Sequence, residues 1–341
     1  MKALDEILER ARSLCPRIVL SEGEDPRVVA AAARAQADGL ARPILVGDPD
    51  RIAAIARGIG CDRRGLETLD PRRAPLAARY AADYEALRRH KGVDAAAAAR
   101  AVADPLVFAA MMVRAGDADG TVGGATATTA DTVRAALQVI GSAPGIGTVS
   151  SFFLMMLCEP HHATRGALLF ADCALVVEPS VNQLADIAIA SARSYRVLTG
   201  DEPRVAMLSF STSGSARHPR VQHVRDATAR ASALSPDLLI DGDLQFDAAF
   251  VPVVSETKAK LSPLKGLANV LIFPDLEAAN IGYKIAQRIG KARAIGPVLQ
   301  GLACPANDLS RGCTAEDVYH LIAVTAVQTG QAEHDGAPYP A

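Results

Sequence analysis

Short apolar runs, each ending in a polar or glycine-rich loop and followed by a helical pattern, recur along almost the whole of this 341-residue chain. Clear examples start at 43 in "PILVGDPDRIAAIARG", at 119 in "DGTVGGATATTADTVRAALQVIG" and at 269 in "NVLIFPDLEAANIGYKIAQRIG". This pattern is typical of βα units in mostly parallel sheets with flanking helices. Ligands bind such sheets in the loops after the carboxyl ends of the strands. We therefore expect an α/β protein whose functional residues lie in those loops.

Two breaks in the pattern predict a division into two domains. A Pro/Gly/Ser-rich stretch covers 141–151, and a second break falls near 302–312. The chain is also too long for one typical core. We expect a first α/β domain of residues 1–144 plus 304–341 and a second of 145–303. Within the second, "SSFFLMMLC" and "GALLFADCALVV" are predicted to pair antiparallel.

Composition excludes several functional classes. The chain is 50% hydrophobic and 22% charged, which indicates a folded protein, and its net charge of −2 gives no general attraction for nucleic acid or an anionic membrane. No apolar run approaches the length of a membrane span. The six cysteines form no CxxC pair, and no zinc-type spacing appears, so we predict no metal. With no export signal at the N-terminus, a cytoplasmic protein with free thiols is expected.

The stretch "NDLSRGCTAED" (307–317) combines helix-starting residues with residues that a helix start does not need. Thr314 and Asp317 match a capping box, and an acid there also suits the positive end of a helix dipole. Ser310 and Arg311 stand just upstream. A cation beside a helix N-terminus is unfavourable unless an anion lies between them. The stretch by itself leaves a plain cap and an anion site equally open.

Two other clusters could bind phosphate. "LRRHKG" (87–92) reads as the basic last turn of a helix ended by glycine, or as a phosphate-binding patch. In the segment from 117 to 134, a strand ends at Gly123-Gly124, and Thr128 or Thr129 is expected to cap the next helix. Backbone N–H groups of that loop could cradle a phosphate, although tight turning alone explains Gly124.

Two polar stretches in the second domain have ordinary explanations. The hydroxyls of "SFSTSGSARHP" (209–219) suit caps and turns, and the acids of "IDGDLQFDAAF" (240–250) suit polar loop contacts.

Taken in order, these loops resemble the phosphate acetyltransferase (phosphotransacetylase) family. The most specific matching stretches are "LSFSTSGSA" (208–216), "NIGYKIAQR" (280–288) and "NDLSRGC" (307–313), and the likeness runs from about residue 3 to about residue 330. The resemblance implies transfer of an acetyl group between acetyl phosphate and coenzyme A, with release of phosphate and no permanently bound cofactor. It also implies a homodimer with an isocitrate/isopropylmalate dehydrogenase-like fold and an active site in the interdomain cleft.

The resemblance also assigns residues by motif. The catalytic serine, arginine and aspartate fall on Ser310, Arg311 and Asp317, and substrate-binding arginines fall on Arg88 and Arg134. Further substrate contacts are expected at motif positions Gly124, Thr128, Thr129, Ser211, Ser213, Asn280, Tyr283, Lys284 and Cys313. Three positions depart from the family pattern, namely Ala127 for histidine, Ala279 for glycine and Lys260 for proline. The first of these departures puts acyl preference and turnover in question more than the reaction itself.

The expected chemistry needs a thiolate, charge stabilisation at the carbonyl and a positive cradle for phosphate. Arg311 can stabilise the charge that develops at the carbonyl or can hold the phosphate. Ser310 can orient the thiol or hydrogen-bond the carbonyl, and Asp317 is the candidate base. An ordinary aspartate is about 4–5 pK units more acidic than a thiol, so complete proton transfer would cost about 6 kcal/mol. Asp317 is therefore expected to act as the thiolate forms, or only after shielding. An acyl-cysteine is not needed, and Cys313 is expected only to line the site.

Three alternatives to acetyl transfer remain. The same chemistry could act on a longer acyl phosphate, as in phosphate butyryltransferase. An NAD-dependent dehydrogenase of the related fold would need nicotinamide contacts and usually a metal carboxylate cluster, which the sequence does not show. A non-catalytic acetyl-CoA-sensing regulatory module is disfavoured because Ser310, Arg311 and Asp317 are all present.

Overall fold

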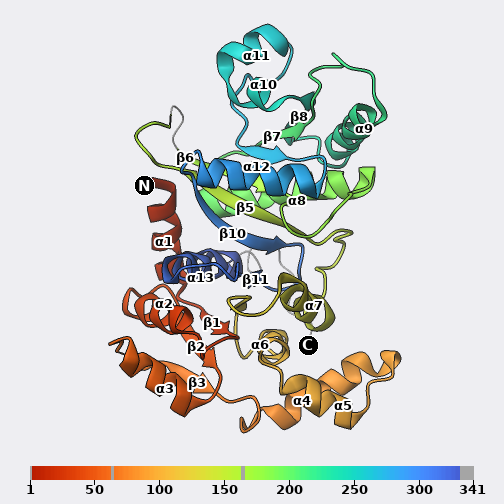
Figure 1. Ribbon diagram of the computed structural model, residues 1–341. Helices are drawn as coiled ribbons and strands as arrows, with labels where there is room; N and C mark the ends of the chain where they lie inside the picture. Colours follow the sequence, from red (N-terminus) through yellow and green to blue (C-terminus); the bar gives the residue numbers. More distant parts are fainter. Residues whose placement is uncertain (1, 63–64, 163–165, 331–341) are drawn as a thin grey trace. The chain divides into compact units, whose positions relative to one another are not determined.

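The computed structural model describes residues 2–62, 65–162 and 166–330 and forms two compact units (Figure 1). Among the described residues, the five-stranded unit comprises 5–144 and 302–330, and the six-stranded unit comprises 2–4 and 145–301. Residues 331–341, which were expected in the first domain, lie outside the described part.

The five-stranded unit alternates strands with helices, as the sequence predicts. Its elements are α1 (Lys2–Leu14) from Asp5 onward, β1 (Arg17–Leu20), α2 (Pro26–Ala37), β2 (Arg42–Val46), α3 (Pro49–Gly58), β3 (Glu67–Leu69), α4 (Ala77–Arg88), η1 (Arg89–Lys91), α5 (Ala95–Val102), α6 (Pro105–Arg114), β4 (Gly120–Gly123), α7 (Thr129–Val139), β11 (Ala306–Asp308) and α13 (Ala315–Thr329). The strands are ordered β11-β4-β1-β2-β3, and every neighbouring pair is parallel. The carboxyl ends of β4 and β11 therefore lie next to each other.

Local sequence starts several of these helices. Asp25, Asp48 and Asp104 are N-caps followed directly by proline, and each carboxylate accepts a backbone N–H from the first helical turn. This combination removes an unsatisfied donor and fixes φ at the first helical position.

Helices cover both faces of the five-stranded sheet. One group contains α2, α3 and α13, and the other contains α4 to α7 (Figure 1). The last helix, α13, packs on α2 and β4. Asn307 anchors that helix, because its buried amide donates to Thr325 Oγ1 at 2.8 Å and to Gln328 Oε1 at 2.6 Å. These hydrogen bonds join β11, which precedes the loop that carries Ser310, to the last turns of α13, which follows that loop.

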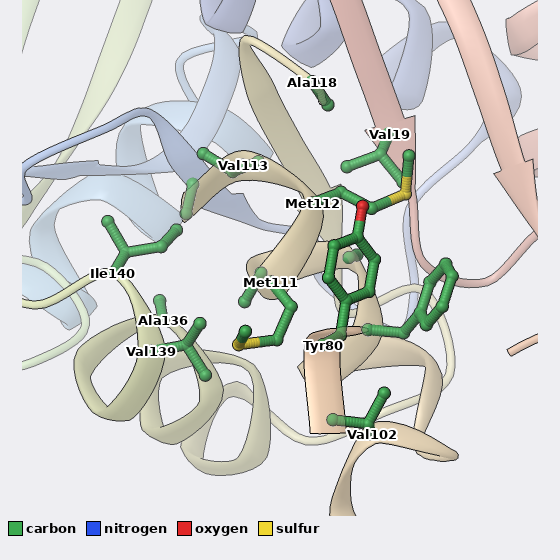
Figure 2. Packing of buried hydrophobic residues seen from close by; sticks show 14 of the residues in the cluster. Val19, Tyr80, Val102, Met111, Met112, Val113, Ala118, Ala136, Val139 and Ile140 are labelled. Carbon is green, nitrogen blue, oxygen red and sulfur yellow. The ribbon is translucent and has the colours of Figure 1, made fainter. Parts of the chain in front are cut away.

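A hydrophobic core lies between α4, α6, α7 and β1 (Figure 2). Met111, Met112 and Val113 of α6 are all buried in it, so this helix is enclosed on nearly every side. Tyr80 packs edge-on against Phe108 with ring centroids 5.3 Å apart, and its hydroxyl donates to Asp117. On the sheet side, the core includes Val19 of β1, Ile44 and Val46 of β2, and Ala306 of β11.

The six-stranded unit is a mixed sheet. Its elements are β5 (Ser150–Leu157), β6 (Gly166–Ala171), α8 (Val181–Thr199), β7 (Arg204–Leu208), α9 (Pro219–Leu234), β8 (Leu239–Leu244), α10 (Phe246–Phe250), α11 (Pro252–Lys258), β9 (Val270–Ile272), α12 (Leu276–Arg288) and β10 (Arg293–Gln300). The order is β10-β5-β6-β9-β7-β8. β5 pairs antiparallel with both β10 and β6, which confirms the predicted antiparallel pair, and the remaining pairs are parallel.

No single described helix is long and apolar enough to cross a membrane; α5 and α6 meet that test only as a pair bent by 99°.

Candidate active site at the carboxyl edge of the five-stranded sheet

Two loops at the carboxyl edge of the five-stranded sheet, together with the helices to which they lead, contain eight of the fourteen predicted site residues. One follows β4 and leads to α7, and the other follows β11 and leads to α13. The Leu309 N–H donates to the Gly123 carbonyl at 2.7 Å, which joins the loops directly. Gly124 has φ +94°, and a Cβ there would lie 2.8 Å from the Leu309 nitrogen. Glycine is therefore required at 124 both for its conformation and for the approach of the second loop.

Arg27 of α2 ties the same loops together. Its guanidinium donates to the carbonyls of Arg311, Cys313 and Ala125 at 2.8, 2.9 and 2.8 Å. Asp25 orients it through an ion pair of 2.8 Å, and the hydrogen bond from Arg27 lowers the pKa of that carboxyl. Sequence reasoning missed Arg27, because it stands at an ordinary helix start after Asp25 and Pro26 and belongs to no local motif. Only the long-range carbonyl contacts reveal its function in holding the site loops.

The carboxylate of Glu22 accepts hydrogen bonds from the backbone of the first loop, between β4 and α7. The N–H groups of Ala125, Thr126 and Ala127 donate to its carboxylate at 2.5, 2.8 and 2.7 Å, and the Thr126 hydroxyl donates at 2.7 Å. Successive N–H groups of this kind form an anion-binding nest. The expected cradle of free N–H groups for phosphate is therefore wrong for residues 125–127, because a carboxylate of the same chain fills it.

Asp308 is a second carboxyl on these loops that sequence reasoning did not single out. It ends β11 and is 0% exposed, and its Oδ2 accepts a hydrogen bond from the Thr129 hydroxyl at 2.6 Å. Its Oδ1 is buried without a hydrogen-bond partner among the described residues. Burial raises the pKa of Asp308 to about 6. An acid at the end of an expected strand was the available signal in the sequence, although no neighbouring residue showed that the carboxyl would be buried.

Ser310, Arg311 and Cys313 lie on the turn after β11. Ser310 and Arg311 are exposed, whereas Cys313 is 8% exposed and burial raises the pKa of its thiol. The Gly312 N–H donates to Ser310 Oγ at 3.3 Å. Within the described part of the chain, the Arg311 side chain has no carboxylate partner. The turn therefore presents a hydroxyl and a free guanidinium one turn before a helix N-terminus.

Asp317 is part of the predicted capping box, which is confirmed. The Thr314 N–H and hydroxyl both donate to Asp317 Oδ2 at 2.8 Å, and the Asp317 N–H donates back to the threonine oxygen at 3.2 Å. Its Oδ1 accepts no hydrogen bond from any described residue. One carboxylate oxygen is thus committed to the cap, and the other is available for chemistry.

The cap of α7 is likewise as expected, with Thr128 as the N-cap residue. Arg134, one turn further on, pairs with Asp131 at 2.5 Å in an exposed ion pair. Such pairs contribute about 0–1 kcal/mol, so Arg134 could exchange this partner for a phosphate at little cost.

Arg88 ends α4, and its Nε is buried without a partner in the described chain. Gly92 follows with φ +78°, which confirms the helix-ending interpretation of "LRRHKG". No hydrogen bond or ion pair between described residues joins Arg88 to either site loop.

The remaining predicted residues belong to the six-stranded unit. Ser211 is buried and accepts the Ala216 N–H at 3.1 Å, and Ser213 has φ +49° with its N–H donating to the Asp243 carbonyl. These contacts are those of a tight turn. The acids of 240–250 make the expected loop contacts, since Asp243 accepts the Gly214 N–H and Asp247 pairs with Lys258 at 2.8 Å.

Asn280, Tyr283 and Lys284 share α12. The Asn280 amide donates to the Cys173 carbonyl at 3.2 Å, and Lys284 donates to the Asn280 oxygen at 2.7 Å. Tyr283 stacks on Phe153 with ring centroids 4.1 Å apart. These contacts support α12 on its sheet, and Ala279, where the family pattern has glycine, is fully buried against the same core.

A cavity of about 520 Å³ opens beside the first loop of the five-stranded unit. It lies at the carboxyl ends of β1, β2 and β3 and reaches Thr126, and its volume is that of a small-molecule site. Five carboxylates and three arginines line it, namely Glu22, Glu24, Asp25, Asp48, Asp70, Arg51, Arg72 and Arg73. The excess of negative charge makes this cavity a poor site for a phosphate.

Known proteins match the chain over nearly its whole length. Residues 2–326 match the family described as "Phosphate acetyl/butaryl transferase". A phosphate acetyltransferase of Paracoccus denitrificans is 51% identical over 329 residues, which cover 96% of this chain and 100% of that protein. The crystal structure of a phosphotransacetylase from Streptococcus pyogenes is 42% identical with a TM-score of 0.90, covering 96% of this chain and 98% of that one.

A more distant structure supports the predicted dehydrogenase-like fold. A 4-hydroxythreonine-4-phosphate dehydrogenase from Burkholderia phymatum matches with a TM-score of 0.52 at 13% identity, covering 91% of this chain and 98% of that one. Identity this low concerns the fold alone, whereas the closer matches also share sequence throughout. The expected resemblance is thus confirmed, and the chain belongs to the phosphate acetyl/butaryl transferase family.

Proposed function

We propose that this protein is a phosphate acetyltransferase that transfers an acetyl group reversibly between acetyl phosphate and coenzyme A. Relatives named phosphate acetyltransferase match it at 44–51% identity, several over nearly their full length. Coenzyme A is a substrate in this proposal, and no resident cofactor takes part.

The observation that carries the proposal is the arrangement of Ser310 and Arg311 before α13. The guanidinium is exposed and lacks a carboxylate partner among the described residues, and the helix dipole adds positive potential at the same place. A planar guanidinium can hold two oxygens of a phosphate or the developing carbonyl oxyanion. Arg134 offers a second cation on the neighbouring loop, held only by an exposed ion pair. Arg88 remains a proposed third phosphate contact.

The proposed step is direct attack in a ternary complex. The coenzyme A sulfur forms a bond to the acetyl carbon, the bond from that carbon to the phosphate oxygen breaks, and inorganic phosphate leaves with the electron pair. The thiol proton passes toward Asp317 Oδ1 while the bond forms, which avoids the full cost of making a free thiolate. Ser310 orients the sulfur or the carbonyl. Cys313 is mostly enclosed and does not act as a nucleophile.

The other predicted residues are proposed to bind the rest of the substrates. Gly124, Thr128 and Thr129 shape the loop beside the acyl phosphate, and residues of the six-stranded unit contact coenzyme A; these are Ser211, Ser213, Asn280, Tyr283 and Lys284. We further propose that the two compact units are the two domains expected from sequence.

We also propose a homodimer in a reducing compartment. Ile281, Ile285 and Ile289 follow one another at four-residue spacing on α12 and just beyond its end, and they are 59%, 53% and 77% exposed. A continuous apolar stripe of this kind favours burial against a partner surface. All six cysteines are free thiols, which suits the cytoplasm.

The test of the proposed function mixes coenzyme A with acetyl phosphate and follows thioester absorbance. The native protein should form acetyl-CoA, and Arg311→Gln should lower kcat by about 100- to 1,000-fold, the typical effect of losing a positioned charge stabiliser. Arg196→Gln removes an arginine whose ion pair is with Glu202 in the other unit, and it should leave the rate unchanged. No thioester from well-folded native protein would refute the proposal, and a preference for butyryl phosphate would select the longer-acyl alternative.

A further inference from the structure

Thr129 and Asp308 form a hydrogen-bonded pair, and the proposed acetyl transfer gives Asp308 no function. Thr129 begins α7 and is partly exposed, whereas Asp308 is fully buried at the end of β11. The oxygens are 2.6 Å apart, although the residues are 179 positions apart in the chain. Because Asp308 is enclosed, it cannot touch a substrate. Any effect that it has on substrate through hydrogen bonding must therefore pass through a neighbour such as Thr129, whose hydroxyl donates to it.

A threonine hydroxyl has a single proton, so the state of its partner determines what it can offer to a ligand. An ionised carboxylate only accepts hydrogen bonds, and Thr129 must then donate its proton to Asp308. In that state the Thr129 oxygen can only accept from other groups, which is of no use to an anion. A protonated Asp308 can donate instead, and the Thr129 proton is then free to point outward.

We propose that Asp308 is a positioning residue that sets whether the Thr129 hydroxyl donates or accepts at the start of α7, and so controls the binding of a phosphate-like anion there. The inference rests on the proposed function, which places the phosphate of the acyl phosphate beside these two loops.

The surrounding loop makes Thr129 the group whose donor capacity can change. The N–H groups of 125–127 are held by Glu22, and the Asp131 N–H is held by the Thr128 cap. These donors are committed whatever the state of Asp308. Burial raises the pKa of Asp308 to about 6, so the proposed change would take place close to neutral pH.

Charged groups on every neighbouring element could move the midpoint of this titration. Glu22, on the loop after β1, adds negative charge near Asp308. The other charged or titratable groups of the neighbouring elements are the Asp25–Arg27 pair beside α2, the Asp131–Arg134 pair of α7, Arg311 after β11, and Glu316, Asp317 and His320 of α13. All of them are retained in the variants below. A difference between variants therefore reports on Thr129 and Asp308 rather than on these neighbours.

The test measures sulfate binding to the native protein by calorimetry between about pH 5 and about pH 8, where sulfate, unlike a phosphate group, does not change its protonation. Native protein should bind sulfate about tenfold more tightly at the low end of this range, the typical worth of one hydrogen bond to a charged group. Asp308→Asn and Thr129→Val should each abolish that pH response. Thr126→Val, which removes a neighbouring hydroxyl that donates to Glu22 and not to Asp308, should keep it.

The Thr129→Val variant distinguishes two explanations of the pH response, namely a change in whether the Thr129 hydroxyl donates or accepts, and direct repulsion of sulfate by ionised Asp308. If that variant retains the native pH response, repulsion by ionised Asp308 is sufficient, and the proposal is overturned. Sulfate affinity of native protein that does not vary with pH, or no sulfate binding at the low end, also overturns it. The titration uses neither coenzyme A nor turnover. A native pH response without acetyl-CoA formation would therefore count against the proposed function and not against the Asp308–Thr129 pair.

Discussion

Replacing Asp308 by asparagine removes a buried carboxyl whose ionisation is costly, so the effect on stability must depend on pH. Burial raises the pKa of Asp308 to about 6, compared with an ordinary value of 3.8. A tenfold difference in acidity corresponds to about 1.4 kcal/mol, so ionising this group costs about 3 kcal/mol more in the folded protein than in the unfolded chain. The stability given by protonated Asp308 is present below about pH 4 and is lost as the pH rises through about 6.

When the pH is raised from about 4 to about 8, the free energy of unfolding of Asp308→Asn should therefore increase by about 2–3 kcal/mol relative to that of the native protein. Unfolding entropy of roughly 2.1 cal/mol/K per residue over this chain converts that gain into about 3–4 °C in the thermal midpoint. Circular dichroism melts of both proteins at constant ionic strength measure it. Taking the difference between two pH values removes any fixed packing cost of the asparagine amide.

Asp131→Asn is the control, because it should respond in the opposite direction. The hydrogen bond from Thr128, followed by that from Arg134, lowers the pKa of the Asp131 carboxyl, so its contribution to stability is present at neutral pH and is lost as pH falls. Native and Asp308→Asn midpoints that run parallel across the whole pH range would refute the assignment of a raised pKa to Asp308.

Four further outcomes are expected. Asp317→Asn should reduce kcat by at least about 100-fold with near-normal coenzyme A affinity by calorimetry, since it removes the base; unchanged turnover would exclude that role. Cys313→Ala should retain most activity in the thioester assay, and its inactivity would point to an acyl-cysteine. Glu22→Gln should weaken charge-assisted bonds worth about 1.5–3 kcal/mol, so amide exchange at 125–127 should accelerate about 10- to 100-fold, with rates in β10 unchanged. Ile285→Lys should shift the protein from dimer toward monomer in sedimentation experiments. A native protein that already sediments as a monomer would contradict the proposed dimer.

Local patterns were enough to predict the elements and their caps, because those depend on residues close together in sequence. The βα units of the five-stranded sheet, the Thr128 cap and the Thr314–Asp317 capping box all follow from neighbours within a few positions. The antiparallel pair of β5 and β6 is likewise joined by a short connection. The same nearness explains why "LRRHKG" could be understood as a helix end from its own letters.

The resemblance of the motifs predicted Ser310 and Arg311 as site residues, but it could not predict which side chains surround them. Glu22 and Ala125 are 103 positions apart, and Arg27 and Arg311 are 284 apart. No local pattern encodes which of many charged side chains meet when distant strands become neighbours. The expected phosphate cradle failed at 125–127 for this reason, since the carboxylate that fills it comes from another loop.

The amino-acid sequence alone thus determined the α/β class, the family resemblance and the capped helix starts, because periodicity, caps and motifs are short-range properties. Only the tertiary structure decided that β11 joins the sheet beside β4 and encloses Asp308 beneath Thr129. Desolvation depends on everything that packs around a group, and the same aspartate on an open loop would keep its ordinary acidity. The chemistry of this carboxyl is therefore a consequence of the fold rather than of its neighbours in the chain.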